Sequence, residues 1–358
     1  MTLRVIIYRL GVIPLLLLLC ILAACSQQDL DQEEQGMVSL KVLASPGTRT
    51  GEGGTATATL PAKETDIFDL SIFIFNSNGD VIGFTSQDFN DGKPTAVVVK
   101  TRKATGCSVY AVANAKTLNK GTSPFDGVST FGVFKAKYLS FTDANAPDNA
   151  NCLLMMGVSS GFDTSSASSA SPATITLKRL ASRIDYTIAV NNDNATGFPI
   201  VVDSYQLRNV PTSTLYQQSD FTNPSMPSST VFANFAKVPT SISSGAAPTS
   251  AGTYYVYANA NTDPDPNSSK GTYLDIWAHS EVQGADGTKY TVWKSNFQVK
   301  MPDGKVKPNY HYKIDIVING SVTGKNGGVI TTYNAYPYFS GSILNPWGTN
   351  ENRDLDLQ

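Results

Sequence analysis

The chain has 358 residues, of which 27 are Lys or Arg and 29 are Asp or Glu. This length predicts two domains. The basic residues are few and scattered, which excludes nucleic acid as a partner, because that function requires a clustered basic surface.

The first 24 residues have the layout of a secretory signal peptide. Arg4 and Arg9 form a basic head, and the apolar run that follows is too short for a transmembrane helix. The letters LAAC at 22–25 match the lipobox of bacterial lipoproteins, whose cysteine is acylated. We therefore expect cleavage before Cys25 and a lipid anchor on its thiol. The alternative is an ordinary cleavage site with a chance cysteine.

Residues 25–36 are acidic and polar, and we expect a flexible tether here because such a segment buries too little surface to order itself. An acidic stretch at this place resembles the surface-export signal of Bacteroidetes lipoproteins. The segment connects the lipidated cysteine to the first folded element.

The first expected strand covers residues 37–45. Val38, Leu40 and Val42 alternate with polar residues, which predicts one buried face. The loop at 46–54 follows and is rich in Gly and Thr, with Arg49 at its centre. Such a loop is pliable and accessible, as sites of proteolysis are.

Nearly all of the remaining elements in the first half are predicted strands. In the stretch 66–85, a strand that is apolar on both faces turns through Asn78-Gly79 into a second strand, which is a strong hairpin signal. The pattern blurs over 117–141, where we expect a short helix or loops. The Ser/Ala-rich stretch 161–173 reads as a long hairpin loop. Further strands are expected at 95–101, 107–115, 152–161 and 173–180.

The second half repeats this style. A hairpin is expected across 284–287, and Pro211 to Pro248 reads mainly as loops. Many short strands with turns between them and little helical periodicity predict an all-β fold of two β-sandwich domains in tandem. The domains expected are 37–180 and 181–337, followed by a C-terminal segment at 338–358. Strands are expected at 182–190, 199–210, 253–260, 271–283, 289–301, 309–322 and 329–347.

The sequence contains few candidates for catalytic or metal-binding residues. Cys107 and Cys152 are compatible with one disulfide or with two small buried residues. His279 and His311 lie within strands and read as structural residues, without metal-ligand spacing around them. Nucleophile-elbow, zinc-protease and phosphate-loop motifs are absent from the sequence. We therefore expect no enzyme activity, no cofactor and no metal.

Several segments together resemble the Bacteroidales fimbrillins, the FimA-like major subunits of type V pili. They are the lipobox, the arginine-bearing loop, IFIFNSNGDV, SVYAVANA, LLMMGVSSG, LKRLASRID, YYVYANA, KPNYHYKIDIVING and NPWGTNENRDLDL, in the family's order and spacing. The resemblance implies two transthyretin-like β-sandwich domains. The loops at 117–150 and 211–250 match no pattern of the family.

The resemblance gives Arg49 a role. It implies that an arginine-specific protease cuts the surface lipoprotein between Arg49 and Thr50, which releases the strand 37–45 with its lipid. A strand from a neighbouring subunit then fills the open slot, which is donor-strand complementation. Arg49 is the only arginine between Cys25 and Arg102, so an arginine-specific protease has one possible cleavage site in this part of the sequence.

The expected donor is the C-terminal segment 338–358, whose apolar residues stand on an otherwise polar tail. The alternative is that the tail forms the last strand of its own domain. The anchors expected are Tyr338, Ile343, Leu344, Trp347, Leu355 and Leu357.

A cleavable loop together with a C-terminal extension favours a stalk subunit over a tip or anchor accessory subunit. The expected partners are other copies of the chain, accessory pilins, the processing protease and a surface receptor. The precursor is expected on the outer membrane and the product in the fimbrium. The rival hypothesis is a monomeric, lipid-anchored glycan-binding protein with Tyr254, Tyr255 and Tyr257 as a stacking platform.

Overall fold

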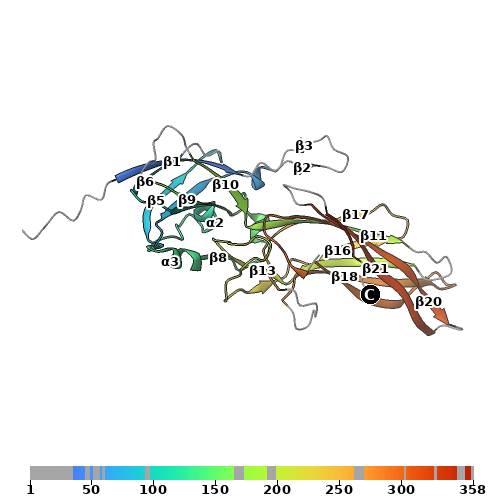
Figure 1. Cartoon of the computed structure of the whole chain (residues 1–358). Coiled ribbons are helices and arrows are strands. Elements are labelled where there is room, and N and C mark those ends of the chain that lie inside the picture. Colours follow the sequence, from blue (N-terminus) through green and yellow to red (C-terminus); the bar gives the residue numbers. More distant parts are fainter. Residues whose placement is uncertain are drawn as a thin grey trace, which may run out of the picture.

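The computed structural model is an elongated molecule in which strands predominate (Figure 1). Among the described residues, no helix has the length and hydropathy needed to span a bilayer. The structure describes residues 35–44, 49–50, 57–58, 61–92, 97–164, 173–191, 199–261, 270–301, 304–325, 329–344 and 351–355.

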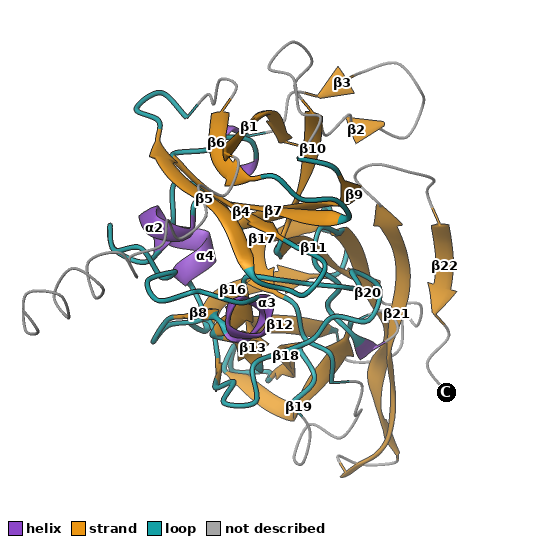
Figure 2. Ribbon diagram, turned by 60° about the vertical axis from the view of Figure 1, so that its left-hand side comes forward, coloured by secondary structure: helices purple, strands orange, loops and turns teal. Residues whose placement is uncertain are grey.

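Seven strands of the N-terminal half wrap around one apolar core. Their pairing runs in the order β1-β10-β9-β7-β4-β5-β6 and returns to β1. The ladders are shortest at two places, with the single pair Gly83–Thr101 between β5 and β6 and two pairs between β9 and β10. We therefore describe the ring as two layers, β5-β4-β7-β9 and β6-β1-β10, with the apolar core between them. Figure 2 shows these strands from a second side. The strands are β1 (Gln35–Ala44), β4 (Asp69–Phe75), β5 (Val81–Asp88), β6 (Val97–Arg102), β7 (Cys107–Ala113), β9 (Met155–Phe162) and β10 (Ala173–Arg179).

The local sequence explains these strands. Every residue of β4 is buried, as its two apolar faces predict, whereas β6 alternates between buried and exposed residues. The predicted β4–β5 hairpin is confirmed, with Gly79 at φ 86° in the turn. A positive φ costs glycine little because it has no Cβ. The predicted hairpin between β9 and β10 is also confirmed by their antiparallel pairing.

Short helices cover the outer face of the β4–β7 layer. The blurred stretch at 117–141 contains short helices, as expected, and also one short strand, which was not expected. Phe134 of α3 is fully buried against Phe73 and Phe75 of β4. The elements are η1 (Ala62–Glu64), α2 (Ala115–Leu118), α3 (Phe131–Ala136), β8 (Tyr138–Ser140) and α4 (Ala146–Asn149).

The C-terminal half is a sandwich of a five-stranded sheet, β17-β11-β20-β21-β22, and a four-stranded sheet, β16-β12-β18-β19. Side chains such as Ile188, Val202, Ile276 and Ile316 fill the space between the sheets. The predicted β18–β19 hairpin is confirmed. The strands are β11 (Ala181–Asn191), β12 (Ile200–Arg208), β16 (Val238–Ser243), β17 (Thr249–Tyr257), β18 (Tyr273–Gln283), β19 (Lys289–Lys300), β20 (His311–Lys325), β21 (Val329–Leu344) and β22 (Glu351–Leu355).

The two halves are packed together. Only Leu180 separates β10 from β11, and the predicted boundary of 180/181 falls at this point. Tyr216 and Tyr257 of the second half lie in one apolar cluster with Phe125 and Phe134 of the first. The short strands β14 (Ser213–Leu215) and β8 also pair across the junction. The predicted all-β fold of two β-sandwich domains is confirmed.

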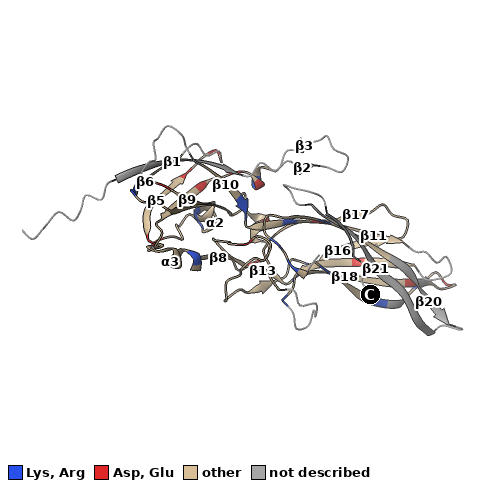
Figure 3. Ribbon diagram, in the orientation of Figure 1, with Lys and Arg blue, Asp and Glu red and all other residues tan. Residues whose placement is uncertain are grey.

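Positions of charged residues are spread over both halves of the ribbon in Figure 3. The remaining short strands are β2 (Arg49–Thr50), β3 (Thr57–Ala58), β13 (Val210–Pro211) and β15 (Phe232–Ala233).

Candidate functional site

The first strand, β1, lies between β6 and β10. It is antiparallel to β6, where Val38 pairs with Val99. It is parallel to β10, where Val42 pairs with Ile175. Leu40 pairs on both sides, with Val97 and with Ala173. The strand begins at Gln35, two residues before its predicted start and inside the predicted tether. Its backbone therefore contributes hydrogen bonds to two neighbours at once.

The strands beside β1 contribute buried side chains to the N-terminal core. Val97 and Val99 of β6, and Ile175 and Leu177 of β10, are almost fully buried. They pack in one cluster with Ile72 and Ile74 of β4. The lining of the position that β1 fills is thus apolar on its core side.

The expected cleavage site follows β1. Arg49 and Thr50 form β2, which pairs at two positions with β3 as a two-stranded sheet of its own. Two pairs are a short ladder, and short ladders open locally at low cost. The expected lipidation site, Cys25, lies outside the described residues.

The expected donor residues lie mostly within the chain's own C-terminal sheet. Tyr338, Ile343 and Leu344 belong to β21, which pairs along its length with β20. Leu355 belongs to β22, which pairs with β21 alone at the sheet edge. The predicted boundary of 337/338 falls inside β21. Trp347 and Leu357 lie outside the described residues. This placement matches the alternative, a last strand in the same domain, for an isolated chain.

The two cysteines do not form a disulfide. Cys107 and Cys152 are free and buried, and they belong to different apolar clusters. Burial raises the pKa of both thiols, that of Cys152 to about 12. The alternative of two small buried residues is the one the structure has.

The aromatic platform of the rival hypothesis is wrong. Tyr254, Tyr255 and Tyr257 are 7%, 7% and 1% exposed. Tyr254 packs in the core of the C-terminal sandwich, and the other two pack at the junction between the halves. None of the three offers a ring face to a sugar in solution.

A buried polar network at the junction was not expected. Glu64 of η1 is 6% exposed and accepts hydrogen bonds from the Tyr255 hydroxyl at 2.6 Å and from Arg183 Nη1 at 3.2 Å. Its backbone carbonyl accepts from Arg179 Nε at 2.6 Å. Burial lowers the pKa of Arg179 to about 10, while the Glu64 carboxylate opposes that shift. Because these partners are far apart in the chain, no local sequence pattern predicts that they contact one another.

The network continues to Asp185 in β11. This carboxylate accepts from Thr253 Oγ1 at 2.6 Å and from Arg183 Nε at 3.0 Å, and it lies 2.7 Å from His311 Nε2. Burial would raise the pKa of Asp185, but the hydrogen bonds from His311, Thr253 and Arg183 outweigh it and hold that pKa well below its usual range. His311 is thus a buried structural residue, as predicted.

His279 also has carboxylate partners. Its Nδ1 lies 2.5 Å from Asp203, and its Nε2 lies 3.1 Å from Glu281. Neighbouring strands of one sheet supply these groups, since β12 pairs with β18. The expected structural role fits this arrangement.

Comparison with known proteins finds a family similarity in the N-terminal part of the chain. Residues 37–195 match the family model of the major fimbrial subunit protein, FimA. The similarity covers rather less than half of the chain, and it shows that this N-terminal part resembles the FimA fimbrial subunits. The match contains β1, the Arg49 loop, the N-terminal ring and β11. Among curated proteins nothing matches.

Solved structures of similar fold include three proposed cell adhesion proteins. One from Parabacteroides distasonis has a TM-score of 0.57 at 18% identity, covering 85% of this chain and 96% of its own. One from Bacteroides eggerthii has a TM-score of 0.55 at 18% identity, covering 86% and 95%. A second from P. distasonis has a TM-score of 0.52 at 14% identity, covering 88% and 99%. The likeness in fold to these three structures covers both halves of the chain.

Proposed function

We propose that the chain is a structural pilin, a stalk subunit of an adhesive fimbrium. It is exported as a precursor lipidated at Cys25 and is cut between Arg49 and Thr50. It then polymerises by accepting a donor strand in the place of β1. The family match over residues 37–195 supports a pilin with a role in adhesion and a place in a cell-surface fimbrium.

The position of β1 is the observation that carries this proposal. Because β1 pairs with both β6 and β10, its removal leaves two facing ladders of unpaired backbone groups. The strands on either side of the vacated position carry the buried apolar side chains of Val97, Val99, Ile175 and Leu177. Unpaired strand edges recruit strands from other chains. A slot open on both sides offers a donor two ladders instead of the one available at an ordinary edge.

The cut has a defined consequence. Cleavage after Arg49 separates β1 from the remainder of the chain, so that β1 is no longer held covalently. Thr50 becomes the new N-terminus, and η1 remains fixed to the second half through Glu64. The joint between the halves therefore does not depend on β1.

The donor is the C-terminal segment, residues 338–358. Among the strands that the structure describes, its outer strand, β22, pairs with β21 alone, so detaching β22 breaks one described ladder. Each apolar side chain buried in the acceptor groove contributes about 1.5–3 kcal/mol. When β22 moves into the slot of a neighbouring subunit, it loses its ladder with β21 and gains ladders with β6 and β10 of that subunit. Donation of Tyr338, Ile343 and Leu344 as well requires β21 to leave β20.

The proposal implies four kinds of partner: other copies of the chain, accessory pilins, an arginine-specific protease and a surface receptor. The precursor is held on the outer membrane by lipid before the cut. A subunit that keeps both the cleavable loop and the tail occupies the stalk, because it accepts a strand and also donates one.

The test is proteolysis of the purified, unlipidated precursor with an arginine-specific endoprotease. The wild type is expected to be cut first at Arg49 and then to form ladders that resist SDS. Arg49→Ala is expected to stay monomeric, whereas the control Lys135→Ala, which removes an exposed charge of α3 outside both the loop and the slot, assembles. A chain that ends at Trp347 is expected to be cut but not to polymerise. Ladders from the truncated chain would refute the donor assignment, and ladders from Arg49→Ala would refute the cleavage step.

A further inference from the structure

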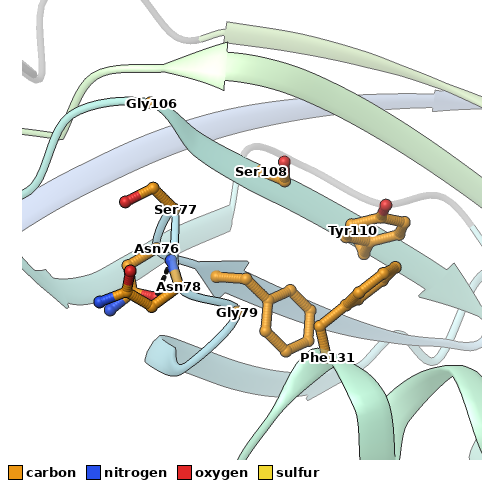
Figure 4. Close-up of a pocket in the computed structure, with 9 residues that line it drawn as sticks. Asn76, Ser77, Asn78, Gly79, Gly106, Ser108, Tyr110 and Phe131 are labelled. Carbon is orange, nitrogen blue, oxygen red and sulfur yellow. Dashed lines mark hydrogen bonds between the residues drawn. The ribbon is translucent and has the colours of Figure 1, made fainter.

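A surface pocket of about 450 Å³ lies on the outer face of the N-terminal sheet. The β4–β5 turn forms one side, and Tyr110 of β7 and Phe131 of α3 lie on the other, with Ser108 of β7 between them (Figure 4). The volume falls within the range of small-molecule sites, which is roughly 300–1,000 Å³.

The turn that forms the pocket is held in place by hydrogen bonds. Asn76 Oδ1 accepts from the backbone N–H of Asn78 at 3.0 Å and from that of Asp80 at 2.8 Å. The carbonyl of Gly79 accepts from the N–H of Phe131 at 2.7 Å, which ties the turn to α3. The pocket is therefore formed before any ligand arrives, which lowers the entropic cost of binding.

One wall is aromatic. The rings of Tyr110 and Phe131 lie with their centroids 5.0 Å apart at 34°, and the fully buried Phe75 supports both. Tyr110 and Phe131 are only half-buried, so each keeps some ring surface at the pocket. Such surface suits an apolar, C–H-rich ligand face.

The polar groups of the pocket are neutral and available. Within the described part of the chain, the hydroxyls of Ser77, Ser108 and Tyr110 and the side-chain amide of Asn78 have no hydrogen-bond partner. Burial raises the pKa of Tyr110, which keeps its hydroxyl protonated as a donor. The lining residues carry no charge at neutral pH, and a charged ligand would lose its hydration there without a counter-charge.

We propose that this pocket binds one neutral pyranose ring of a glycan. One C–H face of the sugar packs against Tyr110 and Phe131, and the sugar hydroxyls pair with Ser108, Tyr110 and the amide of Asn78. A pyranose has this combination of an apolar face and a rim of uncharged donors and acceptors. The proposal deepens the adhesive role by naming a ligand class, but binding to the free chain does not require assembly.

The pocket is separate from the slot of β1. It lies on β4 and β7, whereas β1 pairs with β6 and β10, and the N-terminal core lies between the two layers. A donor strand in the slot therefore leaves the pocket open. Each stalk subunit would then present one sugar site, and a fibre would bind a glycan-coated surface multivalently.

The test is titration of the purified, uncleaved chain with methyl α-mannoside, methyl β-galactoside and N-acetylglucosamine, followed by NMR, with N-acetylneuraminic acid as the charged comparison. At least one neutral sugar is expected to bind in the millimolar range, and the acidic sugar more weakly. Tyr110→Phe, which keeps the ring, is expected to weaken binding about fivefold through loss of one hydrogen bond. Ser108→Leu, which fills the pocket, is expected to weaken it at least about tenfold.

The matched control is Tyr138→Phe, which removes a hydroxyl from an exposed tyrosine outside the pocket and should leave the affinity unchanged. Asn78→Ala on the exposed rim gives a second pocket variant if Ser108→Leu does not fold. Absence of binding by all neutral sugars, preference for the acidic sugar, or unchanged affinity in the pocket variants would overturn the proposal. Because the chain is uncleaved, failure here would leave the assembly proposal intact, and failure to assemble would leave this site intact.

Discussion

The hydroxyl of Tyr255 donates a hydrogen bond of 2.6 Å to the carboxylate of Glu64, which lies 191 residues earlier in the chain. Glu64 belongs to η1 in the N-terminal half and Tyr255 to β17 in the C-terminal half. Arg183 donates to the same carboxylate oxygen. The short helix η1, which follows the Arg49 loop and β3 in the chain, is thus fixed to the second domain.

Glu64→Gln is expected to destabilise the protein by about 3 kcal/mol, because it removes the buried negative charge that pairs with Arg183 Nη1 and faces the buried guanidinium of Arg179. Tyr255→Phe should cost only about 1 kcal/mol, the value of one hydrogen bond. Urea unfolding measures both. Tyr290→Phe, at an exposed tyrosine, is the matched control. Equal stability of Glu64→Gln and the wild type would contradict the role of the network.

Asp185 predicts a specific acid sensitivity. Its pKa is lowered in the folded protein despite burial, since His311, Thr253 and Arg183 stabilise the carboxylate. A lowered folded pKa adds stability above the unfolded pKa, about 3.9, and that stability is lost as the pH falls below it. The urea midpoint of the wild type should therefore fall from pH 5 to pH 2 more steeply than that of Asp185→Asn. Parallel pH profiles would show that the carboxylate is not stabilised by folding.

Gly157→Ala should destabilise the N-terminal ring by about 2–3 kcal/mol. A Cβ at this position in β9 would lie 2.6 Å from both Ile175 Cγ2 and the carbonyl oxygen of Thr176 in β10. Gly132→Ala in the exposed part of α3 is the control, because its Cβ would meet only Thr130 Oγ1 at 3.7 Å. There alanine should be neutral or stabilising by up to about 1 kcal/mol. Relative to the wild type, the thermal unfolding midpoints of the two variants should shift in opposite directions, or the shifts should differ by several degrees.

The free thiols predict a simple labelling result. In a chain with Cys20 and Cys25 replaced by serine, Cys107 and Cys152 should react slowly with a thiol reagent, since both are buried and their thiol pKa values are raised. Both should react in guanidinium chloride without a reductant. No reaction in denaturant would reveal a disulfide.

Local patterns predicted much of the fold. The doubly apolar β4, the Asn-Gly hairpin and the alternating β1 follow from residue spacing alone, and the first strand was placed within two residues of its true start. The parallel pairing of β1 with β10 was not predictable, because no local pattern specifies a partner more than 130 residues away. The strand β16 was also missed, in a stretch whose Ser and Pro content resembles a loop.

The candidate sites were predicted unevenly. Arg49 stands out because it is the only arginine between Cys25 and Arg102. The junction around Glu64 and the pocket beside Tyr110 depend on side chains that only the tertiary structure brings together. The rival platform of Tyr254, Tyr255 and Tyr257 could be decided only by the structure, because the packing that covers their strand comes from residues distant in the chain.

The most direct test of the central claim, the replacement of β1 by a neighbour's strand, is the N-terminal sequence and intact mass of subunits recovered from fibres on the cell surface. The account predicts a subunit that begins at Thr50 and lacks residues 1–49 and any lipid. Subunits that begin at an acylated Cys25 and still form fibres would contradict it.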